Sequence, residues 1–219
     1  QLNLSRLPLL DCDLAELFKK FQQNKTLHTF ILRNSTIWEK SIFQIKRYLR
    51  EENNLQHLDF SEISIPVSFF QNLSDELKRI KTLKVLKLNK CDIDKEHMEF
   101  ISDIIAVNAN LEELHLSENK LVFEDIKTFF QKLKSERKAI KKLDLSKNDI
   151  FKQESKTNSF LTETSPYLNI QELDFTSTCR FFNYLSRLDF VKDLSNGLSL
   201  VKNLKILVLS NNNLNDDFM

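Results

Sequence analysis

Glycine is almost absent from this chain, because Gly197 is the only one among 219 residues. A single glycine excludes the glycine-rich loops that cradle nucleotide phosphates, since the common loop motifs need at least two. Cysteine is also scarce, with Cys12, Cys91 and Cys179 far apart in the sequence. Their odd number and wide spacing exclude a disulfide framework and a zinc-ligand pair, and favour an intracellular compartment.

An excess of charge of one sign and long apolar runs are missing as well. The 32 basic side chains nearly balance the 31 acidic ones, which leaves a net charge of +1. We therefore expect neither nucleic acid nor an anionic membrane surface as a partner. No apolar run reaches the roughly 18 to 20 residues that a membrane-spanning helix needs. The hydrophobic content of 41% is typical of a globular domain with its own core.

What the chain does contain is a repeated leucine pattern. The segment LEELHLSENKL begins at residue 111, and related segments begin at 27, 55 and 83, in steps of 28 residues. Further copies begin at 140, 170 and 204, and residues 1–9 match part of another copy. A nearly constant step predicts one structural unit per repeat, with about seven full repeats and a partial N-terminal one.

Each repeat combines a strand pattern with a helix pattern. Apolar and polar residues alternate over residues 114–116, which predicts a short strand whose leucines point into the core. The following segment carries Ile126, Phe129 and Leu133 at the spacing of one helix face. One repeat alone cannot bury both apolar faces, so we expect stacked repeats with parallel strands joined through helices.

The pattern LxxLxLxx(N/C)x(L/I) resembles the leucine-rich repeat family over essentially the whole chain. The period of 28 to 29 residues resembles its ribonuclease-inhibitor type. The resemblance implies an α/β fold, a right-handed solenoid or horseshoe with a parallel β-sheet on the concave face and α-helices on the convex face. We expect residues 1–219 to form a single domain of this kind. Because neither end carries a capping repeat, we expect the domain to be a fragment of a longer protein.

The ninth position of each repeat is expected to form the turn after the strand. It holds Ser35, Ile63, Cys91, Asn119, Asn148, Thr178 and Asn212. A small polar side chain there can satisfy backbone groups that would otherwise be buried without a partner. Ile63 departs from this pattern, so we expect a locally different turn. We interpret Cys91 as structural, because nothing in the sequence activates it as a nucleophile.

The C-terminal repeats are less regular than the others. Residues 151–166 are polar and poorly periodic, so we expect a loop with a short helix. Residues 181–201 are long for one repeat, and Gly197 is expected to end a helix there. Such segments either contact a partner or reflect drift in a tolerant region. Trp38 is expected to begin the second helix as a packing residue, with partner recognition as the alternative.

Residues between the strand leucines are predicted to form the concave face, where a partner would bind. The predicted partner-binding residues are Thr29, Ile31, Arg33, His57, Asp59, Lys87, Glu113, His115, Lys142, Asp144, Glu172 and Asp174. The alternative interpretation is a solvated strand face without a ligand. Ile206 and Val208 hold the same positions in the last repeat, and we interpret them as a sheet edge that a further repeat covers.

No catalytic or metal-ligating set is predicted. His57 and His115 share a strand face two repeats apart, and at about 4.8 Å per strand they are too distant to share a metal ion. The recurrence of aspartate at residues 59, 144 and 174 is explained better by common ancestry of the repeats than by acid–base chemistry. We therefore expect no metal, no cofactor and no small-molecule substrate.

The sequence favours a noncatalytic protein–protein interaction scaffold, or a structural subunit of a larger intracellular assembly such as a cytoskeletal or ciliary complex. Its expected location is the cytoplasm, in association with the cytoskeleton or a cilium. An alternative follows from the resemblance to Ran GTPase activators, which share this repeat class and carry a functional arginine after an early strand. Arg33 has a similar place, although this chain lacks the acidic tail of those proteins. The fold by itself does not choose between these functions.

Overall fold

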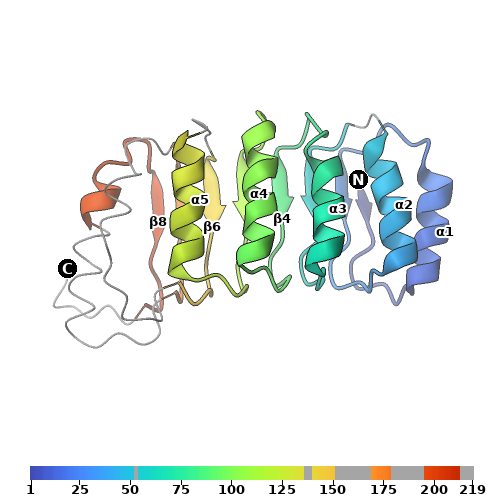
Figure 1. The fold of residues 1–219 in the computed structure, drawn as a ribbon, viewed down its shortest axis with the longest axis horizontal. Helices are drawn as coiled ribbons and strands as arrows, with labels where there is room; N and C mark the ends of the chain where they lie inside the picture. Colours follow the sequence, from blue (N-terminus) through green and yellow to red (C-terminus); the bar gives the residue numbers. More distant parts are fainter. Residues whose placement is uncertain (52–53, 136–139, 151–168, 179–194, 213–219) are drawn as a thin grey trace. The chain divides into compact units, whose positions relative to one another are not determined.

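Short parallel strands alternate with α-helices along the chain, which is the α/β leucine-rich-repeat solenoid that the sequence predicts (Figure 1). The computed structural model describes residues 1–51, 54–135, 140–150, 169–178 and 195–212. The loop predicted within 151–166, most of segment 181–201 and Cys179 lie outside these residues. Among the described residues, no helix combines the length and the apolar character that crossing a membrane requires.

The chain divides into two compact units, Gln1–Leu114 and His115–Met219. The sequence predicts a horseshoe curvature and a single domain. Both depend on how the two units are placed relative to one another, so both stay predictions. The repeat boundaries do not depend on that placement, because each strand lies where the leucine pattern predicts it.

The described part of the first unit contains four parallel strands and four helices before β5 begins. Its strands pair in chain order, with residues one repeat apart in register. The strands are β1 (Leu2–Asn3), β2 (Thr29–Ile31), β3 (His57–Asp59) and β4 (Val85–Lys87), and the helices are α1 (Asp11–Phe21), α2 (Glu39–Arg50), α3 (Val67–Leu77) and α4 (Lys95–Val107). Consecutive helices pack against one another, so each apolar strand face and helix face is buried between neighbouring repeats.

The second unit continues the parallel strands of the repeats. Strand β5 (Glu113–His115) lies at the division between the units, and it is followed by α5 (Phe123–Ser135), β6 (Lys142–Asp144), β7 (Glu172–Asp174) and β8 (Ile206–Val208). Strands β6, β7 and β8 are parallel and in register. The N–H of Leu116, just after β5, donates to the C=O of Asp144 at 2.8 Å. This hydrogen bond joins the end of β5 to β6.

The core consists of the leucine, isoleucine and phenylalanine side chains of the repeat. Phe30 of β2 is fully buried, and its ring centroid lies 5.0 Å from that of Phe18 on α1 and 5.8 Å from that of Phe60 in the next repeat. Burial of each such side chain contributes about 1.5 to 3 kcal/mol to stability. The aromatic contacts therefore join a strand both to its own helix layer and to the neighbouring repeat.

A left-handed residue follows every strand, at the eighth position of the repeat. Positive φ angles occur at Arg6, Asn34, Glu62, Lys90, Glu118, Lys147, Ser177 and Asn211, and also at Asp92. None of these residues is glycine, although glycine adopts this conformation at the lowest cost. The turn is maintained by backbone hydrogen bonds between repeats, as from the N–H of Glu118 to the C=O of Ser146 at 3.0 Å. Interrepeat contacts thus offset a local strain of about 1 kcal/mol per residue.

The different turn predicted at Ile63 is wrong. Glu62 has the same left-handed φ of 63° as its counterparts, and its N–H donates to the C=O of Asn89 at 2.8 Å. Ile63 itself is 2% exposed. The backbone ladder forms this turn whether or not the ninth residue is polar, so an apolar side chain can be buried there.

The structural role predicted for Cys91 agrees with its surroundings. Its Sγ lies 3.2 Å from the C=O of Phe60, in the preceding repeat, and 3.4 Å from that of Asn89. Burial of Cys91 raises the pKa of its thiol to about 12, so the reactive thiolate is suppressed at neutral pH.

Two predictions at helix ends need correction. Trp38 does precede α2 as its N-cap, but its side chain is 58% exposed and is not a packing residue. Gly197 lies within a helical segment that continues to Leu198, and it does not have the positive φ of a helix-ending glycine. Sequence patterns locate such ends only to within one or two residues.

Candidate partner-binding groove

Alternation along the strands places the third and fifth repeat positions on the face opposite the core. The residues between them, such as Leu143 and Leu173, are 1% and 3% exposed. In the second unit the third positions are Lys142, Glu172 and Ile206, which are register partners across β6, β7 and β8. The fifth positions are Asp144, Asp174 and Val208, in register in the same way. Six side chains therefore form two adjacent columns on this strand face.

These columns surround a groove with a volume of about 380 Å³. We call it the strand-face groove, and its lining residues are His115, Lys142, Leu143, Asp144, Glu172, Leu173, Asp174, Ile206 and Val208. Five of the predicted partner-binding residues are among them: His115, Lys142, Asp144, Glu172 and Asp174. The structure thus brings the charged residues of three repeats together around one depression.

Ile206 and Val208 also line this groove, and their interpretation as a sheet edge that a further repeat covers stays a prediction. Ile206 is 48% exposed, and Leu207, at the repeat position that is buried in β6 and β7, is 37% exposed on the same strand. Ile206 and Val208 hold the same repeat positions as Glu172 and Asp174. Those positions were a sufficient signal for placing both residues on the same face. What sequence reasoning lacked was evidence that the aliphatic and acidic pairs are adjacent parts of one hollow.

The recurring aspartates also have a structural role that sequence reasoning missed. Oδ1 of Asp174 accepts a hydrogen bond from the N–H of Thr176 at 2.8 Å, and Oδ1 of Asp144 accepts one from the N–H of Ser146 at 3.0 Å. Asp59 makes the same bond to the N–H of Ser61 at 2.9 Å. Each is an Asx turn at the strand end, and the Asp-x-Ser/Thr pattern is the signal that predicts it.

Asp144 is held in its ionised form by its neighbours. Burial on its own would raise the pKa of this carboxyl, but hydrogen bonds from the His115 side chain and from the side chain and backbone of Ser146 outweigh burial and lower it. The Oγ of Ser146 is 2.7 Å from Oδ1 of Asp144, and Nδ1 of His115 is 3.7 Å from Oδ2. A carboxylate of this kind stabilises positive charge nearby.

The other charges of the groove are unequally balanced. Nζ of Lys142 lies 2.8 Å from Oε2 of Glu172, so this third-position pair is internally neutralised. Asp174 differs, because within the described part of the chain its second carboxylate oxygen has no donor. The groove therefore combines a neutralised ion pair, an aliphatic pair and an acidic pair with one oxygen available.

The predicted partner-binding residues that do not line the groove all belong to the first unit. Thr29 is in register with His57, and Ile31 with Asp59, which is in turn in register with Lys87. Asp59 is buried, His57 is exposed, and Thr29, Ile31, Lys87 and Glu113 are half-buried. Which of these residues contact a partner stays a prediction.

Arg33, the residue behind the GTPase-activator alternative, is engaged in an ion pair. Its Nη2 lies 2.7 Å from Oε1 of Glu62, the left-handed residue of the next repeat. The pair joins two adjacent turns, and the arginine side chain is 44% exposed. The GTPase-activating role stays a prediction.

A second, larger hollow lies in the first unit near the C-terminal ends of α2 and α3. It has a volume of about 750 Å³ and its lining includes Lys25, Arg50, Glu51, Arg79 and Lys81. Two of its basic side chains are already paired: Nη2 of Arg50 with Glu76 at 2.8 Å, and Nζ of Lys25 with Glu51 at 3.4 Å. These pairs make it a weaker candidate than the strand-face groove. Within the described ranges, no cluster of three or more potential metal ligands occurs.

Comparison with known proteins finds only weak sequence similarity. No family model matches the chain. A curated relative, "NACHT, LRR and PYD domains-containing protein 14" of Mus musculus, is 27% identical over 100 residues, which cover 45% of this chain and 10% of that protein. The chain thus matches about a tenth of the length of this relative.

Two solved structures are similar at low identity. "Leiomodin-1 Actin-Binding Site 2 (ABS2)" has a TM-score of 0.47 and 15% identity, covering 88% of this chain and 92% of that one. The tropomodulin C-terminal domain of Caenorhabditis elegans has a TM-score of 0.45 and 13% identity, covering 86% and 95%. A weak match to a protein named for its LRR domain agrees with the leucine-rich-repeat architecture seen here.

Proposed function

We propose that this chain is a noncatalytic interaction scaffold that binds a protein partner on the strand face of its repeats. The observation that carries this proposal is the strand-face groove, in which Ile206 and Val208 lie beside charged side chains on the exposed side of the sheet. Protein interfaces likewise combine apolar side chains with polar and charged ones. A stack of repeats also presents a long surface for its mass, which suits a binding protein.

The chemistry of the groove supports binding over catalysis. A general base working near neutral pH needs a pKa close to that pH, whereas the pKa of Asp144 is lowered from its ordinary value. Lys142 is paired with Glu172, and the first oxygen of Asp174 is used by the Asx turn. These side chains are arranged to hold positions and charge, which favours recognition of another protein.

We further infer that the repeats are of the ribonuclease-inhibitor type. This is supported by the 28-residue step of the first repeats and by α-helices of 11 to 13 residues between the strands. We propose that the partner belongs to an intracellular assembly, with the cytoskeleton as the first to test. Cosedimentation of the chain with actin filaments, compared with the chain alone, provides that test, and a chain that stays in the supernatant contradicts an actin partner.

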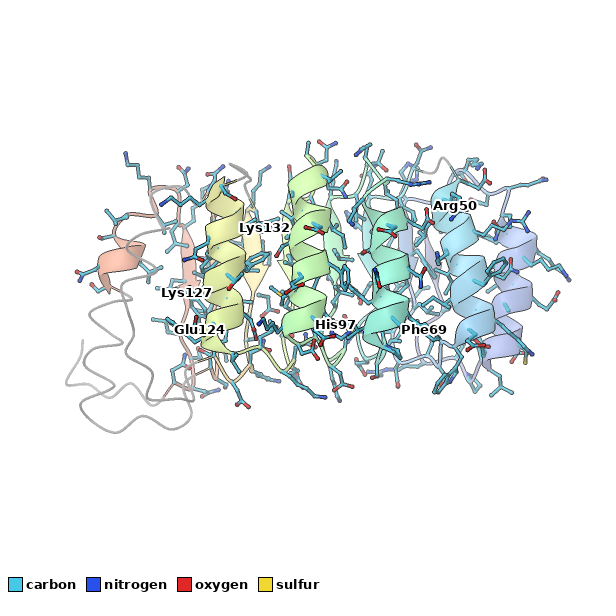
Figure 2. The ribbon with its side chains drawn as sticks, viewed as in Figure 1. Arg50, Phe69, His97, Glu124, Lys127 and Lys132 are labelled. Carbon is cyan, nitrogen blue, oxygen red and sulfur yellow. The ribbon has the colours of Figure 1, made fainter. Side chains whose placement is uncertain are left out.

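The binding face can be tested by chemical footprinting of lysines in a natively purified complex. Lys142 lines the groove, whereas Lys127 and Lys132 come from α5, on the helix side of the same unit (Figure 2). Acetylation of the free chain and of the complex, followed by mass spectrometry, compares the three amines. We expect the partner to protect Lys142 and leave Lys127 and Lys132 unchanged. Protection of the α5 lysines with Lys142 unprotected would place the partner on the helix face.

A further inference from the structure

The strand-face groove has two chemically different halves, and their order across the sheet is set by strand register. Asp144 and Asp174 are register partners on β6 and β7. On the next strand, β8, Val208 is the register partner of Asp174, and Ile206 is the register partner of Glu172. Neighbouring strands are about 4.8 Å apart, so an acidic pair lies directly beside an aliphatic pair.

The acidic half carries negative charge that the described residues balance only in part. Like charges placed opposite each other on adjacent strands repel, and Asp144 and Asp174 are such a pair. His115 lies beside Asp144, but the second oxygen of Asp174 has no donor among the described residues. A cationic group from outside, placed between the two carboxylates, would relieve the repulsion and satisfy that oxygen.

Arginine fits this place better than lysine. Its planar guanidinium carries several N–H donors in a fixed arrangement and can reach two carboxylate oxygens at once. The aliphatic half then requires an apolar side chain from the same partner, because Ile206 and Val208 offer no hydrogen bonds through their side chains. An acidic segment, a nucleic acid or a phosphate group would be repelled, because three carboxylates face one lysine in this groove.

The spacing of the two halves defines the spacing in the partner. The midpoint between Asp144 and Asp174 is about one and a half strand spacings from Val208, or roughly 7 Å. Side chains i and i+2 of an extended segment point the same way and are also roughly 7 Å apart. We propose that the groove binds an extended protein segment with arginine or lysine at one position and an aliphatic or aromatic residue two positions away. This inference rests on the proposed scaffold function and names the chemistry of its partner.

A displayed library of random short peptides, selected against the whole chain, tests the proposal. We expect the enriched peptides to share a basic residue two positions from an aliphatic or aromatic one. The strongest of them, made synthetically with a fluorescent label, then serves as the probe in a titration. A library without this common pattern, or with no enrichment at all, would overturn the proposal.

Variants of the chain separate charge from fold. Asp174→Asn keeps the oxygen that accepts from Thr176 but removes the charge, and we expect about tenfold weaker peptide binding, as for loss of a charge-assisted hydrogen bond. Ile206→Thr keeps the branched shape and should weaken binding about threefold. Glu124→Gln, on α5 across the sheet, removes the same charge outside the groove and should change nothing (Figure 2).

The two proposals fail in different ways. If a native partner protects Lys142 but selected peptides lack a basic residue, or Asp174→Asn binds them as well as the wild type, the recognition chemistry is wrong and the scaffold function stands. If the peptides bind as expected but native partners protect only the α5 lysines, the groove chemistry is right and the proposed binding face of the scaffold is wrong. Circular dichroism of each variant confirms that binding is compared between folded chains.

Discussion

The side chain of Asn148, at the ninth repeat position, offers the sharpest test of how the repeats hold together. Its Oδ1 accepts from the N–H groups of Asn119 and Leu121 at 3.1 and 3.2 Å. Its Nδ2 donates to the C=O groups of Leu116 and Leu145, both at 2.9 Å. Asn148 is 1% exposed, so these bonds lie inside the core and join two consecutive repeats. We expect Asn148→Ala to be strongly destabilising.

The magnitude follows from which backbone groups lose their partner. In the described part of the chain, the N–H of Leu121 and the C=O of Leu145 bond to Asn148 alone, while the C=O of Leu116 keeps a second bond from Nδ2 of Asn119. Truncation therefore leaves two buried groups unsatisfied and removes a bond from the N–H of Asn119. Each unsatisfied group costs about 1 to 3 kcal/mol, so we expect a loss of about 3 to 5 kcal/mol in unfolding free energy.

Urea unfolding followed by circular dichroism measures this loss. With a slope of about 1 to 3 kcal/mol per molar urea, the midpoint should fall by at least about 1 M. Asn203→Ala is the matched control, because Asn203 is exposed and, among the described residues, its amide bonds only to Oδ1 of Asn169. We expect the control to change stability by less than about 0.5 kcal/mol. If Asn148→Ala stays within about 1 kcal/mol of the wild type, the ninth-position amide does not hold the repeats as argued.

Three further outcomes are expected. Lys90 is exposed and has a left-handed φ of 54°. Lys90→Val should therefore lower the unfolding free energy measured in urea by about 1 to 2 kcal/mol, whereas Lys90→Gly should not lower it. Equal stability of the two variants contradicts the strain argument. In a Cys179→Ser chain at pH 8, a thiol reagent should modify exposed Cys12 rapidly and buried Cys91 only after unfolding, whereas two fast thiols contradict the burial of Cys91. Burial raises the pKa of Tyr48 to about 12, above its ordinary value of 10, so the stability it contributes is present below pH 10 and is lost as pH rises toward 12. Among the described residues the buried hydroxyl of Tyr48 has no hydrogen-bond partner, so Tyr48→Phe should be at least as stable as the wild type at pH 7. The variant should become increasingly more stable than the wild type above pH 10, and a constant difference across this range refutes the assignment.

Much of the fold could be predicted because its information is local and repeated. The alternation around Leu114 marks a strand in every copy, and a step of 28 residues aligns those strands without any knowledge of tertiary contacts. The same register placed Asp144 beside Asp174, as the parallel pairing confirms. A helix end such as the one near Gly197 was less predictable, because a cap depends on one or two residues and not on a period.

Only the tertiary structure decided which strand residues form a site and what else they do. The sequence determined that residues 142, 144, 172, 174, 206 and 208 share one face, because a strand alternates with a period of two. It did not reveal the hollow around them or the ion pair between Lys142 and Glu172, nor that one oxygen of Asp174 is bound in a turn while the other is available. Those properties depend on distances between side chains of different repeats. Repetition in the sequence specifies the order of the repeats but not the depth or the charge balance of the surface that they build.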